Sequence, residues 1–194
     1  MRKAALERTT NETKVRLALD LDGGECRIST GLGFFDHMLN QLARHGGFGL
    51  VLEAQGDLQV DSHHLVEDVG LCLGDALREA LGDRRGIGRW GEAHVPLDES
   101  LARVVVDLSG RPYCVFQGGL PPVVLGDGFQ AEMVREFFIA FSTRGQFNLH
   151  ATVLYGENTH HKIEALFKGL ARALRAAVRI EGSELPTTKG TLTQ

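Results

Sequence analysis

The chain of 194 residues is long enough for one sizeable domain, and its 43% apolar and 24% charged residues are typical of a globular protein. Its net charge of −4 argues against a nucleic-acid-binding surface, which needs clustered Lys and Arg. It contains neither an apolar run of membrane-spanning length nor a signal segment, so we expect no membrane partner and a cytoplasmic location. Cys26, Cys72 and Cys114 form no C-x-x-C pair, so we expect neither a disulfide framework nor a thiolate metal site.

The first third of the chain predicts strands around one helix. Apolar and polar residues alternate over residues 3–30, which predicts one strand, a turn at Gly23-Gly24 and a second strand. Over residues 31–47 the apolar residues recur at helical spacing until Gly46-Gly47, which predicts a helix. Residues 48–60 predict a strand, a turn and a further strand.

The rest of the chain predicts three more helices separated by strands. Residues 62–82 predict a helix with Asp61 or Ser62 as its N-cap. Residues 95–118 predict two strands that flank the sequence Ser-Gly-Arg-Pro. The other expected segments are a Gly-rich turn at 82–91, a loop at 118–128, a helix at 130–145, a strand at 147–156, a helix at 160–180 and a loose polar tail at 181–194.

The predicted elements repeat. Helix, glycine break, strand and a helix that begins with His-His follow one another twice in the same order. Such a repeat predicts an α+β fold made by tandem duplication of one αβ unit. We therefore expect a single domain over residues 1–194, with halves of approximately 1–93 and 94–180 and helices packed on mixed β-sheets.

The sequence His-His-x-x-Glu opens both repeated helices, as His63, His64 and Glu67 and again as His160, His161 and Glu164. Positions i and i+4 share a helix face, so the first His and the Glu of each copy can hold one cation. The second His points about 100° away, which suggests two ions completed by residues from elsewhere. A single copy would more often be a solvated helix cap, since the helix dipole alone favours an early Glu. Two copies among only eight histidines favour a metal site.

Two further histidines extend this ligand set. His37 lies on the polar side of its helix, on one face with Gln41 and either Arg44 or His45. His150 lies among apolar strand residues, where the alternative is a hydrogen-bonded core histidine. Six histidines and two glutamates divide into two sites of three His and one Glu. Four protein ligands leave coordination positions open, which favours catalysis, and Mn²⁺, Fe²⁺ and Zn²⁺ all suit these donors.

Several segments together resemble the imidazoleglycerol-phosphate dehydratase family in its single-function form. These segments are FFDHMLNQLARHGG, DSHHLVEDVG, SGRPY, HHKIEALFKGLARAL and a terminal TTKG, in that order from RTTNET to the tail. The resemblance implies a fold of the ribosomal protein S5 domain 2 type, two Mn²⁺ ions per active site and a homo-oligomer of 24 subunits with active sites at subunit interfaces. It also implies eight metal ligands: His37, His63, His64, Glu67, His150, His160, His161 and Glu164.

The resemblance further implies an activity and residue roles. The activity is dehydration of D-erythro-imidazole-glycerol phosphate to imidazole-acetol phosphate in histidine biosynthesis, through an imidazolate that two metal ions stabilise. Arg89, Arg111, Thr187, Thr188 and Lys189 would bind the phosphate, although the family usually has Ser at the position of Thr187. Glu12 would transfer protons, and Glu67 would act as ligand and proton carrier. Apart from the resemblance, we expect Gln41 and His45 to line the pocket, and Asp68 and Asp98 to orient ligand histidines. Without the resemblance, Glu12, Arg89, Arg111 and Lys189 would be read as solvated surface side chains.

Two other functions use the same residues. A metal-dependent hydrolase would release phosphate or cleave an amide, and a metal-storage protein would catalyse nothing. The dehydratase would form a ketone without free phosphate. Because neither ligand set looks able to close within one unit, we also expect metal to control assembly.

Overall fold

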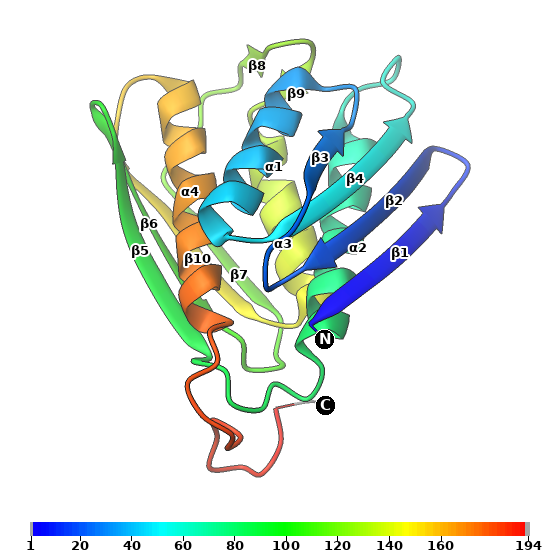
Figure 1. Ribbon diagram of the computed structural model, residues 1–194. Coiled ribbons are helices and arrows are strands. Elements are labelled where there is room, and N and C mark those ends of the chain that lie inside the picture. The colour runs from blue at the N-terminus through cyan, green and yellow to red at the C-terminus, as the bar shows by residue number, and fades with distance from the viewer. Residues whose placement is uncertain (1, 193–194) are drawn as a thin grey trace.

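The computed structural model describes residues 2–192, and residues 193–194 of the predicted tail lie outside the described part. Four helices form where helical spacing predicts them (Figure 1). They are α1 (Gly33–Gly46), α2 (His63–Leu81), α3 (Met133–Gly145) and α4 (Thr159–Ala177). The strands are β1 (Lys3–Thr9), β2 (Thr13–Asp20), β3 (Cys26–Ser29), β4 (Gly49–Gly56), β5 (Trp90–Leu97), β6 (Ser100–Asp107), β7 (Tyr113–Gln117), β8 (Val124–Leu125), β9 (Phe129–Gln130) and β10 (Asn148–Tyr155).

The two four-stranded sheets have the same topology. The first has the order β1-β2-β4-β3 and the second β5-β6-β10-β7. In each sheet the first two neighbouring pairs are antiparallel and the last pair is parallel. Figure 1 shows the helices between the two sheets, with α4 against β5 and β6 and α2 against β1 and β2. The chain therefore has the predicted α+β class, with helices packed on mixed sheets.

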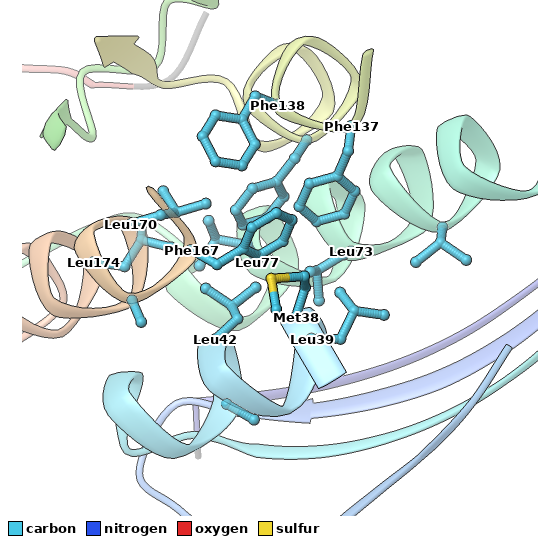
Figure 2. Packing of buried hydrophobic residues seen from close by; sticks show 14 of the residues in the cluster. Met38, Leu39, Leu42, Leu73, Leu77, Phe137, Phe138, Phe167, Leu170 and Leu174 are labelled. Carbon is cyan, nitrogen blue, oxygen red and sulfur yellow. The ribbon is translucent and has the colours of Figure 1, made fainter. Parts of the chain in front are cut away.

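Alternation along the strands and apolar stripes on the helices build the core. In β2, Val15, Leu17 and Leu19 are buried while the residues between them are exposed. The stripes of all four helices meet in one cluster, in which Phe137 stacks on Phe167 with ring centroids 5.4 Å apart (Figure 2). This shared core fixes the helix N-termini that carry the histidines.

Four predicted segments differ from the structure, and two of them differ because their turns lack the usual Gly or Pro signal. Residues 3–20 form two strands, since the hydroxyl of Thr10 accepts the backbone N–H groups of Glu12 and Thr13 and turns the chain. The single strand expected before Ser-Gly-Arg-Pro is likewise β5 and β6, joined at Asp98, whose φ is +46°. The strand expected at the end of residues 48–60 is a turn, and the loop expected at 118–128 contains β8.

The segment between the sheets is held by a buried guanidinium. Arg84 is 1% exposed and donates from Nη1 to the carbonyls of Leu108 (2.9 Å) and Gln146 (3.0 Å), and from Nη2 to that of Gly145 (3.1 Å). Arg84 follows α2, whereas its acceptors end β6 and α3, so it ties the first part of the chain to the second. The predicted division near residue 93 stays a prediction, and β5 already begins at Trp90.

None of the helices among residues 2–192 is long and apolar enough to cross a bilayer.

Candidate metal centre and phosphate pocket

A cluster of three potential metal ligands forms where α1 meets α4. Nε2 of His37 lies 3.2 Å from Oε2 of Glu164, and Nε2 of His160 lies 2.9 Å from the same oxygen. The three ligand atoms lie within 4.8 Å of one another. The contact between His160 and Glu164 confirms the shared face expected from their i, i+4 spacing. Two imidazole nitrogens and one carboxylate oxygen suit a first-row transition metal, so the donor set fits the ion that the sequence predicts.

The carboxylate of this cluster is ionised and fixed by its neighbours. Burial would raise the pKa of Glu164, but hydrogen bonds from Lys168, His160 and His37 outweigh it and lower that pKa to about 2. Lys168 contacts the other carboxylate oxygen at 2.7 Å, and the ring of Phe34 packs edge-on against His160 at 5.1 Å. A deprotonated Glu164 is therefore ready to accept a cation without losing a proton.

The second histidine of each pair has a carboxylate on Nδ1. For His64 it is Asp57, at 3.0 and 3.2 Å, and Oε2 of Glu12 lies 3.8 Å from the same nitrogen. For His161 it is Glu99, at 2.7 Å. These hydrogen bonds raise the pKa of both histidines. The hydrogen bond from His161 also lowers the pKa of Glu99, together with hydrogen bonds from backbone N–H groups and from the Ser100 hydroxyl.

The other predicted ligands do not reach the α1/α4 cluster. Among residues 2–192, His37, His160 and Glu164 form the one such group of three or more potential ligands. His63 and Glu67 lie at the start of α2, where Glu67 is exposed. His150 is exposed on the outer face of β10, between buried Leu149 and Ala151. The alternative of a buried core histidine is therefore wrong for His150.

The five predicted phosphate-binding residues do come together. Arg89, Arg111, Thr187, Thr188 and Lys189 line one pocket of about 570 Å³ with Trp90 and the end of the tail. Asp107 holds the Arg89 guanidinium at 2.7 and 3.2 Å, and Arg89 also donates to the carbonyl of Pro186 at 2.8 Å. The predicted tail is thus anchored at Arg89. The pocket brings three cationic side chains together with the three hydroxyls of Thr187, Thr188 and Thr191, and groups of this kind bind anions.

The pocket and the histidines lie at opposite ends of α4. The backbone N–H of Arg89 donates to the carbonyl of Ala177, the last residue of α4, whereas His161 lies in its first turn. At 1.5 Å per residue, about 24 Å of helix separates His161 from Ala177. A small phosphorylated molecule cannot reach both ends of one chain at once.

A larger hollow, of about 710 Å³, lies on the outer face of the first sheet. Its three cations are already paired: Lys14 and Arg16 with Glu7 at 3.8 and 2.9 Å, and Arg27 with Glu53 at 3.0 Å. In the pocket at Arg89, by contrast, only Arg89 is seen paired to a carboxylate among residues 2–192, while Lys189 and Arg111 are exposed.

Two predicted pocket residues lie on α1, about one and two helical turns beyond His37. Nε2 of His45 lies 2.9 Å from the amide oxygen of Gln41, which identifies His45 rather than Arg44 as the residue sharing that face. Burial, together with Lys168, Arg172 and Arg44, lowers the pKa of His45, so this ring is neutral near pH 7.

Neither residue predicted to orient ligand histidines does so closely. Asp68 instead accepts hydrogen bonds from Arg8 and the Thr13 hydroxyl, and Asp98 is 3.8 Å from Nε2 of His161. Asp57 and Glu99 contact these histidines instead. The sequence did not indicate them, because their contacts depend on how two loops close. Lys168 was missed as well, although its i+4 spacing from Glu164 was a usable signal.

Comparison with known proteins identifies the family of this chain. A sequence model described as imidazoleglycerol-phosphate dehydratase matches residues 30–174. The chain belongs to this family. A relative of that name from Lacticaseibacillus casei is 57% identical over 99% of the chain and 100% of the relative, and one from Azorhizobium caulinodans is 56% identical over 99% of both.

Solved structures of the family have the same fold. Imidazoleglycerol-phosphate dehydratase from Staphylococcus aureus is 39% identical and superposes with a TM-score of 0.83, over 92% of this chain and 99% of the other. The enzyme from Pyrococcus furiosus, crystallised with the compound (S)-C348, is 36% identical with a TM-score of 0.83 over 96% of this chain and 99% of the other. Membership of the family makes the protein a hydro-lyase of histidine biosynthesis that acts on a small molecule. A metal dependence in general agrees with the cluster of His37, His160 and Glu164.

Proposed function

We propose that this chain dehydrates D-erythro-imidazole-glycerol phosphate to imidazole-acetol phosphate with two Mn²⁺ ions per active site. The observation that carries this proposal is the cluster of His37, His160 and Glu164, which presents three ligand atoms within 4.8 Å in a protein of this family. His63, His64, Glu67, His150 and His161 are the other proposed ligands. When bound, the two ions would act as Lewis acids that stabilise the imidazolate form of the substrate ring, from which the neighbouring hydroxyl can leave.

The chain's own residues have distinct proposed tasks. Arg89, Arg111 and Lys189 would hold the phosphate, with the hydroxyls of Thr187 and Thr188 completing the contacts. Asp107 supports this role because it fixes the direction of the Arg89 guanidinium. Gln41 and neutral His45 would line the pocket beside the metal cluster.

Proton transfer is assigned to Glu12. Its side chain is exposed, and its Oε2 lies 3.8 Å from the ring of the proposed ligand His64. From there, protonated Glu12 would give its proton to the leaving hydroxyl, and Oε2 of the resulting carboxylate would then take the carbon-bound proton. Glu67 is the alternative carrier, since its carboxylate is also exposed.

We further propose that each active site forms between subunits of a large homo-oligomer, with 24 subunits as the resemblance implies. The separation of His161 from the Arg89 pocket supports this, because one chain cannot offer both to one substrate. The dispersed ligands on α2 and β10 support it too, since they need partners from another chain. We propose the cytoplasm as the compartment, where a phosphorylated biosynthetic substrate is retained.

A product assay tests the reaction. Mn²⁺-loaded protein should convert imidazoleglycerol phosphate to the ketone without free phosphate, and His160→Ala should abolish this. Release of phosphate without ketone would instead identify a hydrolase.

A mixing experiment tests the shared site. Arg89→Ala and His161→Ala chains should each be inactive alone. The two variants are stripped of metal, mixed in equal amounts and reassembled. They should then regain about one quarter of wild-type activity, because half of the sites receive an intact Arg89 from one chain and half of those receive an intact His161 from the other. A mixture as inactive as its components would place each site within one chain. Sedimentation of metal-stripped protein tests the expected control of assembly by metal, which an unchanged sedimentation coefficient would contradict.

A further inference from the structure

The loop that enters α4 is built around one carboxylate. Oε2 of Glu99 lies 2.7 Å from Nδ1 of His161, and Oε1 accepts the backbone N–H groups of Asn158 (2.7 Å) and Glu157 (3.0 Å) and the hydroxyl of Ser100 (2.8 Å). Four donors therefore fix this carboxylate. Such a fixed acceptor determines the rotation of the His161 ring.

In the loop that enters α2, Asp57 holds the ring of His64 in the same way. Both carboxylate oxygens of Asp57 lie within 3.2 Å of Nδ1 of His64. Asp57 directly follows β4, and its side chain is half-buried. The second histidine of each pair is thus held at Nδ1, and each Nε2 is directed away from its carboxylate.

The two carboxylates that contact these histidines come from positions that do not correspond in the two halves. Glu12 directly precedes β2, as Glu99 directly precedes β6. Asp57 follows Gly56 at the end of β4, as Glu157 follows Gly156 after β10. The loop from Asp57 to its histidine pair is three residues longer than that from Glu157. Its extra length lets Asp57 fold back onto His64, whereas Glu157 stays exposed and Glu99 acts in its place.

We propose that Asp57 and Glu99 are positioning residues of the metal sites. Each carboxylate accepts the Nδ1–H of its histidine, selects that tautomer and leaves Nε2 as the metal-binding atom. Asp57 also leaves Glu12, the counterpart of Glu99, free for proton transfer. The inference rests on the proposed function, because it assumes that His64 and His161 bind metal.

The test measures Mn²⁺ affinity of the assembled full-length protein from the EPR signal of the free ion. Glu99→Gln and Asp57→Asn should each weaken binding by about 10- to 100-fold, as loss of such hydrogen-bond partners does. Glu157→Gln removes an exposed carboxylate from the same loop and should bind Mn²⁺ as the wild type does. The thermal midpoint of the metal-free variants shows whether each has folded, and Asp57→Asn is independent of the Glu99 loop.

A double-mutant comparison separates positioning from a structural role. In a His161→Ala background, Glu99→Gln should weaken Mn²⁺ binding no further, because there is no ring left to orient. An equal effect with and without His161 would overturn the inference, as would wild-type affinity in both Glu99→Gln and Asp57→Asn. Wild-type affinity in His161→Ala and His64→Ala would overturn the ligand assignment of the proposed function as well. If His161→Ala and His64→Ala lost Mn²⁺ affinity while Glu99→Gln and Asp57→Asn kept it, only the positioning role would be overturned and the ligand assignment would stand.

Discussion

Helices α2 and α4 begin with the same His-His-x-x-Glu sequence, yet their surroundings differ. Glu164 of α4 is 8% exposed, contacts Lys168 and faces His37 of α1. Glu67 of α2 is exposed, and the position corresponding to Lys168 is Leu71. The helix packed on α2 is α3, which contains no histidine. One copy of the motif therefore belongs to a preformed cluster of three potential ligands, whereas the other belongs to no such cluster among residues 2–192.

The helix packing contacts on the C-terminal side of the two motifs differ as well. A Cβ added at Gly74 of α2 would lie 2.6 Å from the carbonyl oxygen of Phe141 and 2.8 Å from the amide nitrogen of Gly145. The corresponding residue of α4 is Ala171, which is fully buried. Helices α2 and α3 thus approach at backbone distance, whereas the partner of α4 leaves room for a side chain. A duplicated motif can keep its ligand residues while its packing and its chemistry diverge.

The largest effect is expected from a substitution that disrupts the close contact between α2 and α3. Gly74→Ala should lower the free energy of unfolding by about 3 kcal/mol, because the new methyl group meets rigid backbone. Ala171→Gly at the corresponding place in α4 should cost only about 1–2 kcal/mol, for a lost methyl group and a looser backbone. Urea unfolding of both metal-free variants measures the difference. Equal losses would show that the two helix pairs pack alike.

The preformed cluster should bind the first ion. In dilute metal-stripped protein titrated with Mn²⁺, His37→Ala should weaken the first binding step at least about 100-fold, or about 2.7 kcal/mol. His63→Ala should change that step less than about threefold, because the described residues 2–192 give α2 no group of three potential ligands. Comparable weakening in both variants would contradict a difference between the two motifs.

The carboxylates near His64 and His161 should affect turnover unequally. With Mn²⁺ saturating, Asp57→Asn should lower kcat about tenfold further than Glu99→Gln does, because Glu12 would be drawn to the vacated Nδ1 of His64 and lost as a proton carrier. Steady-state rates at several Mn²⁺ concentrations separate this effect from metal affinity. Equal kcat values would mean that Glu12 is not affected by Asp57.

The smallest expected effect concerns Lys168. The depressed pKa of Glu164 stabilises the metal-free protein above the ordinary carboxyl pKa of 4.5, and this contribution is lost as the pH falls towards 2. Lys168→Met should raise that pKa, reduce stability at pH 6 by about 1 kcal/mol and move the acid transition to higher pH. Leu71→Met, at the corresponding position of α2, is the matched control. Identical acid-unfolding curves for wild type and Lys168→Met would exclude the ion pair as a source of stability.

Much of the fold was visible in the sequence because the helices carry wide apolar stripes. The divisions between β1 and β2 and between β5 and β6 were not visible, since neither turn contains Gly or Pro. The exposure of His150 could have been read from the sequence, because Leu149 and Ala151 must both point into the core.

The site was predictable only where local spacing decides it. The pair of His160 and Glu164 follows from helix geometry, whereas the contacts of Asp57 and Glu99 follow from loop closure over long sequence separations. The residues of the phosphate pocket came from resemblance, and the partner of Arg89, Asp107, carried no sequence signal.

The buried side chain of Arg84 has a consequence for how the molecule comes apart. Its guanidinium supplies the donors for three backbone carbonyls that end β6 and α3, although Arg84 itself follows α2. Opening either sheet alone would strand a charged group or leave carbonyls unpaired in an apolar interior. We therefore expect the slowest-exchanging amides of both sheets to share one opening free energy, so that the two repeats behave as a single cooperative unit.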